Sequence, residues 1–371
     1  MSQAAHYRDD FLDDLAPAFA GFYREWYPWC HTTVLATLET LASREFIDRA
    51  AGSPLSDQAH QTLRTVWFDP YRSYHTRSGK MLRPVLVCLL MRAFDRDPRE
   101  LPAVVAMAEV IHAASLVLDD IADDSPLRRG AETAHRMVGV RVAGAGASAW
   151  LNASFELLSQ PMPGLDATRA ARLLEAIAWE HWVTGVGTTI DTTWPWIGGF
   201  DRTPAQYLQS VVHRSTSYTY RLPLKIGAIA AGATSEQTRR IAAFGEELGL
   251  AFQIIDDILN VQPGDEHWGK ALAEDITQGK INLQVLLSLQ RLAAPRRARL
   301  IQILESRTQD PATLHEAVAL MDASGAFEAA RAIALQHVDR TKALVQGLDF
   351  LSPTCRQQLA AFVDYVIQRK R

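Results

Sequence analysis

Residues 101–124 read LPAVVAMAEVIHAASLVLDDIADD, an apolar run that ends in four aspartates. The run has polar breaks at helical spacing and predicts a buried helix over 101–121. Residues four apart share a helix face, so Asp119 lies above Asp123. Like charges at this spacing repel, and the dipole at a helix C-terminus disfavours them further. A cluster of this kind indicates cations nearby.

A second run of the same kind ends in Phe252-Gln253-Ile254-Ile255-Asp256-Asp257-Ile258-Leu259-Asn260. One acidic cluster alone could be a solvated helix end. Two clusters, each after an apolar run that must be buried, favour ligands for a cation, because buried charge needs compensation. Mg²⁺ prefers oxygen ligands and is commonly shared between carboxylates and substrate phosphates. The two clusters therefore predict a diphosphate site with Mg²⁺ as cofactor.

Most of the remaining chain has helical periodicity and few strand signals, which predicts an all-α fold. Turns rich in Gly, Pro and Asp separate the segments, and no Gly- or Ser-rich linker divides them. We expect one helical domain over 71–371, preceded by a helical extension over 1–70 with a packing role for its tryptophans. Beyond 101–121, the expected helices are 82–94, 166–190, 204–231, 236–261, 281–293, 295–306, 311–323, 326–347 and 353–368.

Composition excludes several classes of protein. The 371 residues carry a net charge of −4 and no block of Lys and Arg, which argues against a general nucleic-acid partner. Three widely spaced cysteines, Cys30, Cys88 and Cys355, argue against a disulfide framework. The acidic N-terminus does not resemble a signal peptide, and no apolar window is long enough for a transmembrane segment. We expect a cytoplasmic protein.

Basic residues recur beside the acidic clusters. Gly79-Lys80-Met81-Leu82-Arg83-Pro84 opens a helix, where Lys80 and Arg83 could hold a phosphate. Arg128-Arg129-Gly130 follows the first cluster, and Lys270 and Lys280 follow the second. A surface Lys or Arg is ordinary by itself, but the repeated position suggests anion binding. His112, about two turns before Asp119, would by itself be read as a core histidine.

Together these motifs resemble the trans-isoprenyl diphosphate synthase family, which includes farnesyl and geranylgeranyl diphosphate synthases. The resemblance covers about 78–280 and extends loosely to the C-terminus. The matching elements are GKxxRP at Gly79–Pro84, ExxH at Glu109 and His112, DDxxD at Asp119–Asp123 with RRG at Arg128–Gly130, FQxxDDxxD at Phe252–Asn260, and then Lys270, Asp275 and Lys280.

The resemblance implies a single-domain helical bundle around a deep central cavity, with the two aspartate motifs facing each other at its mouth. It implies a prenyltransferase that joins an allylic diphosphate to isopentenyl diphosphate, and a homodimer. Magnesium ligands would be Asp119, Asp123 and Asp256, with Asp120 completing the first motif and Gln253 contributing to substrate binding in the second. Arg128, Lys270 and Lys280 would bind the allylic diphosphate, and Lys80, Arg83, His112 and Arg129 would bind isopentenyl diphosphate.

Four positions depart from the family pattern. Asn260 replaces the last aspartate of the second motif, where we expect weakened but not abolished metal binding. Arg214 stands where the family usually has Lys, which keeps the charge but changes the shape. Thr188 replaces a usual Gln, while Asp191 is retained, and Met81 replaces a common Arg. Asp191 and Arg214 remain candidates for the catalytic set.

Side chains one turn before Asp119 lie roughly 6 Å deeper along the helix. Here they are Ala114 and Ser115, with Ile111 one turn further. Small residues leave the floor of the cavity open, so we expect geranylgeranyl diphosphate or a longer product. Aromatic residues of other helices, such as Trp150 or Phe155, could still block the cavity.

Three other functions fit parts of the sequence. A terpene cyclase, or a prenyltransferase with a non-isoprenoid acceptor, would share the fold, but a cyclase would not need the second cationic set. A non-catalytic partner subunit would tolerate decay of the first motif, which is intact. A helical metal-dependent phosphohydrolase commonly needs a His-Asp dipeptide, which this chain lacks.

Overall fold

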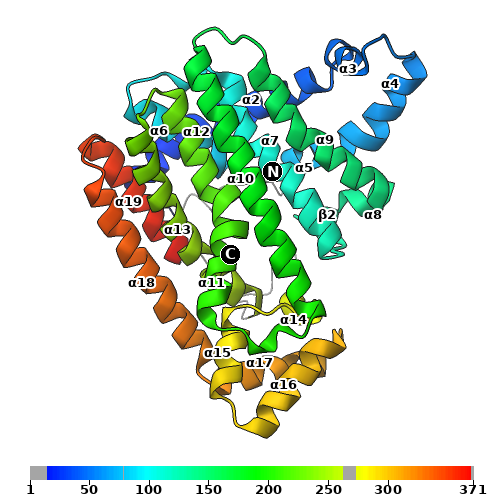
Figure 1. The fold of residues 1–371 in the computed structure, drawn as a ribbon, viewed down its shortest axis with the longest axis vertical. Coiled ribbons are helices and arrows are strands. Elements are labelled where there is room, and N and C mark those ends of the chain that lie inside the picture. The colour runs from blue at the N-terminus through cyan, green and yellow to red at the C-terminus, as the bar shows by residue number, and fades with distance from the viewer. Residues whose placement is uncertain (1–14, 78, 262–272, 369–371) are drawn as a thin grey trace. The chain divides into compact units, whose positions relative to one another are not determined.

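Helix α7, Pro102–Ala122, has its most extensive contacts with four other helices in a computed structural model that describes residues 15–77, 79–261 and 273–368 (Figure 1). Its neighbours are α2 (Pro17–Leu41), α6 (Leu82–Ala93), α9 (Val140–Ser159) and α12 (Leu222–Ala230). Pro102 begins the helix at a position where its missing N–H costs nothing. The helix is apolar on almost every face, which suits a helix surrounded by others. The expected helix over 101–121 is confirmed.

The chain divides into two compact units. The first comprises Met1–Ala178, Leu222–Ile241 and Phe350–Gln358, and the second comprises Trp179–Arg221, Ala242–Asp349 and Leu359–Arg371. Helices α10 (Ala167–Thr193), α13 (Ser235–Val261) and α19 (Pro353–Gln368) contribute residues to both units. The expectation that the two aspartate motifs face each other concerns the placement of the units and stays a prediction.

In the first unit, helix α2 is part of the core. One face of α2 is buried against α6 and α7, with Phe19, Tyr23, Trp26 and Val34 almost fully covered. Three short helices follow, α3 (Arg44–Ala51), α4 (Asp57–Leu63) and α5 (Asp69–Thr76), with a π-helical turn over Arg64–Phe68. The proposed boundary between extension and domain at residue 70 falls at the start of α5 and stays a prediction.

The second unit packs its helices around a largely aliphatic core. Local signals set their starts, as at α11, where Thr203 and Gln206 form a reciprocal capping box, and at α15, where Asn282 caps Val285. The helices of this unit are α11 (Pro204–Thr216), α14 (Glu274–Thr277), α15 (Leu283–Arg291), α16 (Ala294–Ser306), α17 (Pro311–Ala323) and α18 (Ala326–Gly347).

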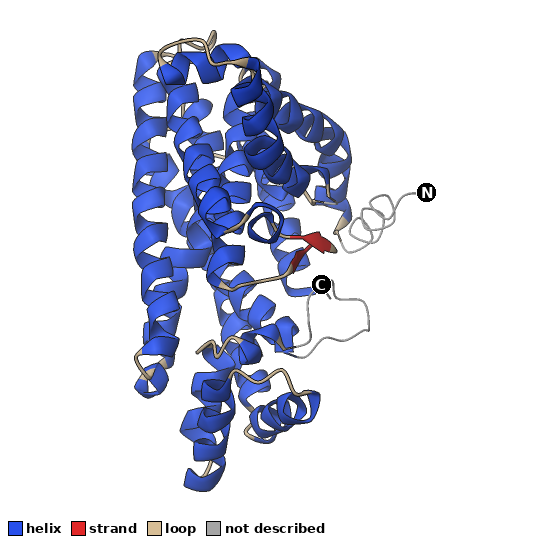
Figure 2. Ribbon diagram, turned by 90° about the vertical axis from the view of Figure 1, so that its right-hand side faces the viewer, coloured by secondary structure: helices blue, strands red, loops and turns tan. Residues whose placement is uncertain are grey.

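Two local features depart from the expected helices. The segment 204–231 is interrupted by a π-helical turn over Ser217–Arg221, where Ser217 and Arg221 both bond to the buried carboxylate of Glu180. Single π-helical turns inside α-helices are rare and are often found at functional sites. A two-stranded hairpin, β1 (Leu127–Arg128) and β2 (Ala131–Glu132), follows α7, and Figure 2 shows it in red. Within the described ranges the fold is otherwise helical, and none of these helices is long and apolar enough to cross a membrane.

Candidate active site

The first aspartate motif forms the C-terminal end of α7. Asp119 and Asp120 occupy its last turn, and Asp123 is the C-cap. The side chain of Asp119 is 46% exposed, whereas Asp120 is completely buried. The carboxylate of Asp119 is therefore accessible to a ligand from solvent, whereas that of Asp120 contacts only protein groups.

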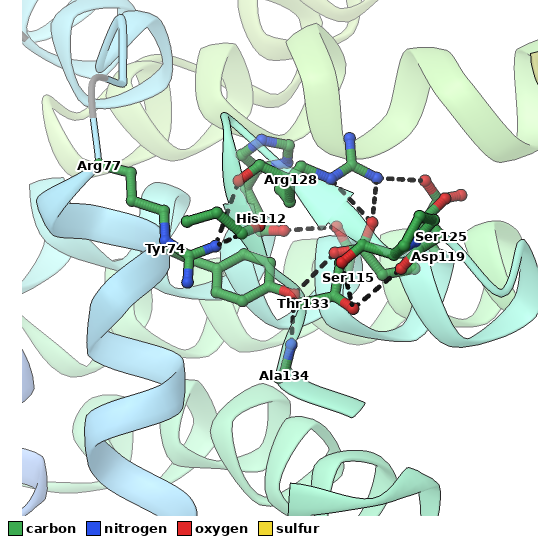
Figure 3. Close-up of polar contacts among 12 residues, drawn as sticks. Tyr74, Arg77, His112, Ser115, Asp119, Ser125, Arg128, Thr133 and Ala134 are labelled. Carbon is green, nitrogen blue, oxygen red and sulfur yellow. Dashed lines mark hydrogen bonds and ion pairs between the residues drawn. The ribbon is translucent and has the colours of Figure 1, made fainter. Parts of the chain in front are cut away.

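Asp120 is held by two side chains from other segments (Figure 3). The hydroxyl of Tyr74 donates to Oδ2 at 2.7 Å, and Nε of Arg128 donates to Oδ1 at 2.8 Å. Burial raises the pKa of Asp120, and Arg128 opposes that rise. Burial would lower the pKa of Arg128, but Asp120 and Asp119 outweigh it and raise that pKa. The result is a buried ion pair with its hydrogen bonds satisfied.

Arg128 also reaches Asp119, with Nη2 3.3 Å from Oδ2. Asp119 and Asp123 are one turn apart and both partly exposed, so oxygen donors are available at this helix end. Mg²⁺ commonly takes one or two carboxylates together with substrate phosphates and water, and this donor set fits that mode. In the described part of the chain, no three His, Cys, Asp or Glu side chains converge as a metal site.

Arg129 and Gly130 form the two-residue turn of the hairpin. Both have positive φ, 53° for Arg129 and 74° for Gly130, and Arg128 pairs with Ala131 across the turn. A two-residue hairpin with positive φ at both positions matches the right-handed twist of its strands. Glycine adopts this conformation readily, but a left-handed arginine is strained by about 1 kcal/mol or more. Such strain is often found at functional sites.

The second cationic set gathers beside this hairpin. Nη1 of Arg129 donates to the carbonyl of Tyr74 at 2.8 Å, and a Cβ on Gly79 would lie 2.7 Å from that nitrogen. Glycine at position 79 therefore lets Arg129 lie against the loop. Lys80 and Arg83 are partly buried, and Tyr23 donates to the carbonyl of Lys80 at 2.7 Å.

His112 and Glu109 belong to this set as well. Burial, and then the charges of Arg83 and Arg129, hold the pKa of His112 well below its usual range, so its imidazole is neutral. Burial raises the pKa of Glu109, and the same two arginines oppose the rise. Glu109 and His112 are therefore both buried within the electrostatic reach of Arg83 and Arg129.

The second aspartate motif lies near the end of α13. Asp256 is partly exposed, and Asp257 is buried at 5% exposure. Asp257 accepts hydrogen bonds from the hydroxyl of Tyr207 and, at 2.7 Å, from Nε2 of Gln253. Burial and then the charge of Asp275 raise the pKa of Asp257 to about 7, against the lowering effect of these hydrogen bonds.

Asn260 has a structural contact at this end. Its Oδ1 accepts from the backbone N–H of Asp275 at 3.1 Å, at the first turn of α14. The carboxylate of Asp275 accepts from Asn282 at 3.2 Å, and Nζ of Lys280 lies 3.6 Å from its other oxygen. Lys280 therefore lies beside an acidic partner near the motif. Lys270 lies outside the described residues.

Asp191 and Arg214 form an ion pair between α10 and α11. Nε of Arg214 is 3.4 Å from Oδ2 of Asp191, and each side chain is 20% exposed. A Cβ on Gly187 would lie 2.6 Å from the backbone nitrogen of Arg214, so glycine permits the two helices to approach here.

The three residues expected at the cavity floor lie on α7. Ile111 and Ala114 are fully buried, and Ser115 is partly exposed. The Ser115 hydroxyl donates to the carbonyl of His112 at 2.7 Å, a local bond that leaves the helix unbroken (Figure 3). Trp150 of α9 is also buried, and it stacks on Tyr71 at 4.3 Å.

Sequence reasoning missed three residues that hold this machinery. Tyr74 and Tyr207 each bond to the buried aspartate of one motif, and Arg77 bonds to the hairpin backbone. A tyrosine 46 or 50 positions away from its partner carries no periodic signal. A partial signal for Arg77 was its place three residues after Tyr74, since that spacing puts both on one face.

Comparisons with known proteins confirm the resemblance. Residues 65–321 match the profile of the polyprenyl synthetase family. A short chain isoprenyl diphosphate synthase of Methanothermobacter thermautotrophicus is 31% identical over 332 residues, which cover 88% of this chain and 96% of that protein. A nonaprenyl diphosphate synthase of Mycobacterium tuberculosis is 30% identical over 316 residues, covering 85% of this chain and 90% of that protein.

A solved structure supports the fold. Geranylgeranyl pyrophosphate synthase from Corynebacterium glutamicum, complexed with isoprenyl diphosphate and magnesium, matches with a TM-score of 0.77 at 23% identity. The match covers 92% of this chain and 99% of that chain. The all-α fold is that of the isoprenyl diphosphate synthases. The chain belongs to the polyprenyl synthetase family, and it is a prenyltransferase of the trans-polyprenyl diphosphate synthase class.

Proposed function

We propose that this protein joins an allylic diphosphate to isopentenyl diphosphate in a Mg²⁺-dependent condensation. The observation that carries the proposal lies within the first unit. The partly exposed carboxylate of Asp119 pairs with Arg128, and the next residue, Arg129, acts together with Arg83 on the buried Glu109 and His112. One diphosphate would bind through metal ions, and the other would bind directly to arginine, which suits anion recognition. A terpene cyclase has no use for the second set.

The proposed roles follow the motifs. Asp119, Asp123 and Asp256 would hold Mg²⁺, which when bound would neutralise charge on the allylic diphosphate. Asp120 would position Arg128 in the first motif, and Gln253 would position Asp257 in the second. The residues proposed for the allylic diphosphate are Arg128 and Lys280, those for isopentenyl diphosphate are Lys80, Arg83, His112 and Arg129, and Lys270 stays a sequence-based prediction.

The chemistry needs no protein nucleophile. Arg128 and Lys280 would stabilise the negative charge that develops as the allylic C–O bond breaks and pyrophosphate leaves. The double bond of isopentenyl diphosphate then forms the new C–C bond to the allylic carbocation, and a proton is lost to the released pyrophosphate. Asp191 and Arg214, paired on α10 and α11, would contribute to the electrostatic environment of the reaction.

An assay with allylic primers tests the proposal. Purified protein with Mg²⁺, isopentenyl diphosphate and each allylic primer should release pyrophosphate and yield an elongated diphosphate, and EDTA should abolish turnover. A hydrocarbon formed from the allylic diphosphate alone would indicate a cyclase instead. Absence of elongation with every primer would contradict the proposal and favour a partner-subunit role.

We propose geranylgeranyl diphosphate or a longer chain as the product. The small side chains of Ala114 and Ser115 on α7 support it, because small residues one turn before the motif would leave room for a growing chain. Ala114→Phe and Ser115→Phe should shorten the product, which chromatography of the dephosphorylated alcohols would detect. Unchanged chain length in both variants would rule out this floor.

We further propose a homodimer. On α10, Trp179, Trp182, Val186 and Ile190 form one stripe, with exposures of 58%, 69%, 38% and 37%. Apolar surface of this kind, concentrated on one helix face, is typical of an interaction surface. Sedimentation should show a dimer that Trp182→Glu dissociates, and a wild-type monomer at all concentrations would contradict the proposal.

A further inference from the structure

We infer that Tyr74 and Arg77 are positioning residues that hold the hairpin 127–132 in the geometry that anion binding requires. The inference rests on the proposed function, because Arg128 and Arg129 of this hairpin are the proposed diphosphate ligands. Neither Tyr74 nor Arg77 belongs to a motif singled out in the sequence. Both lie at the end of α5, outside the segments that carry the aspartates.

Arg77 bonds to the backbone of the hairpin at three points, and Figure 3 shows its side chain beside Arg128. Its Nη1 donates to the carbonyls of Arg128 and Ala131, each at 3.2 Å, and its Nη2 donates to the carbonyl of Glu132 at 2.8 Å. These carbonyls lie on both strands and on both sides of the turn. A planar guanidinium can span them because its donors have a fixed fork geometry.

Tyr74 fixes the two ends of the same segment. Its hydroxyl donates to Asp120, which in turn holds Arg128, and it accepts from the backbone N–H of Ala134 at 3.0 Å. Ala134 begins α8 (Ala134–Val138), directly after the hairpin. The carbonyl of Tyr74 accepts from Arg129. One residue therefore connects the motif, the turn and the following helix.

The hairpin needs this support. Each strand has two residues, and a two-stranded ribbon is marginal without other packing. The turn also holds Arg129 at a positive φ that arginine disfavours. Without Arg77 the turn would relax, and the guanidinium of Arg129 would leave its place beside Tyr74.

A direct role for Arg77 in phosphate binding is the alternative. The geometry argues against it, because both Nη1 and Nη2 donate to backbone carbonyls. Positioning and charge can be separated by experiment, since lysine keeps the charge and loses the fork.

The test compares Arg77→Gln, Arg77→Lys and the control Arg72→Gln. Arg72 lies on α5 and pairs with Glu39 at 3.2 Å, away from the hairpin. Arg77→Gln and Arg77→Lys should both raise KM for isopentenyl diphosphate about tenfold, the effect of losing one charge-assisted contact. The control should keep the wild-type KM. Restoration of wild-type KM by Arg77→Lys would overturn the inference, as would equal KM values in Arg77→Gln and Arg72→Gln.

Tyr74→Phe has a matched control in Tyr71→Phe. Tyr71 is on the same helix, and its hydroxyl donates to the carbonyl of Val110 in α7, so its loss should destabilise without affecting the hairpin. Both variants should lower the melting temperature, but only Tyr74→Phe should raise KM. A KM increase of equal size in both variants would mean that Tyr74 contributes only to stability, and it would overturn the positioning role of Tyr74.

Calorimetric binding of inorganic pyrophosphate with Mg²⁺ gives a readout independent of turnover. If wild-type protein binds pyrophosphate but elongates no primer, the proposed function fails. In that case, weaker pyrophosphate binding by Arg77→Gln than by Arg72→Gln would still support the positioning role of Arg77, and equal binding would overturn it.

Discussion

The two acidic helix ends share one plan. In each, the first aspartate is partly exposed and the second is buried, and a tyrosine from another segment donates to the buried carboxylate. Tyr74 does so for Asp120 and Tyr207 does so for Asp257. The pairing of adjacent aspartates thus combines an oxygen donor at the surface with an anchor inside.

The ends differ in how the buried charge is compensated. Asp120 accepts hydrogen bonds from the guanidinium of Arg128, whereas the hydrogen bonds that Asp257 accepts come from neutral groups, the hydroxyl of Tyr207 and the amide of Gln253. Arg128 is also a proposed substrate ligand, so the first anchor connects folding to anion binding. The same pair of adjacent aspartates can therefore be stabilised either by an ion pair or by neutral hydrogen-bond donors.

The largest effect should come from removing the compensating side chain at each end. Arg128→Ala leaves the buried carboxylate of Asp120 without its cation and should cost about 3–5 kcal/mol of unfolding free energy. Gln253→Ala removes a neutral donor and should cost about 1 kcal/mol. Urea unfolding followed by circular dichroism measures both. Arg136→Ala, which breaks an exposed pair with Asp124, should change stability by less than about 1 kcal/mol. Equal losses at the two ends would break the comparison.

A smaller difference is expected when the buried carboxylates are replaced. Asp120→Asn removes the charge that Arg128 faces and should cost about 3 kcal/mol. Asp257→Asn has two opposing effects. It removes the cost of burying a charge, but its new NH₂ group faces a hydrogen-bond donor. The net loss of unfolding free energy should therefore stay at about 1 kcal/mol. The same unfolding experiment applies. A larger loss for Asp257→Asn would show that the second anchor depends on charge.

The smallest effect should follow Asn260→Asp, which restores the family pattern. Asn260 Oδ1 accepts from the backbone N–H of Asp275, and a carboxylate can accept the same bond. Turnover should therefore rise by no more than about twofold, the small gain expected if Asn260 weakens metal binding without abolishing it, because a charge change at this partly exposed position is worth less than about 0.5 kcal/mol. Steady-state kinetics over a Mg²⁺ series would test it. A marked gain in Mg²⁺ affinity would mean that the position contacts the metal.

The fold was largely predictable because its helices are long and begin at clear signals. Helices α7 and α13 end within one residue of their predicted ends. In both, an apolar run followed by aspartates indicates which residues are buried and where the helix ends. The hairpin was not predictable, because two-residue strands have no alternation to detect. Its stability comes from contacts with α5, distant in sequence.

The candidate site divides in the same way. The motifs identified Asp119, Arg128 and Arg129 because their spacing is local. The family resemblance gave Asp120 a role different from that of Asp119, but the spacing alone did not, and only the fold shows that Tyr74 and Arg128 enclose Asp120. The pairing of Asp191 with Arg214 likewise depends on the close approach of two helices at Gly187.

Helix α2 has a consequence for the minimal folding unit. The family profile begins at residue 65, yet α2 lies wholly before it, with Tyr23 bonded to the carbonyl of Lys80 and the Cys30 thiol 3.6 Å from that of Cys88 on α6. A truncation at residue 65 would expose the apolar faces of α6 and α7. It would also remove the hydrogen bond from Tyr23 to the carbonyl of Lys80. A segment that lies before the family profile thus forms part of the same core as the segment within it.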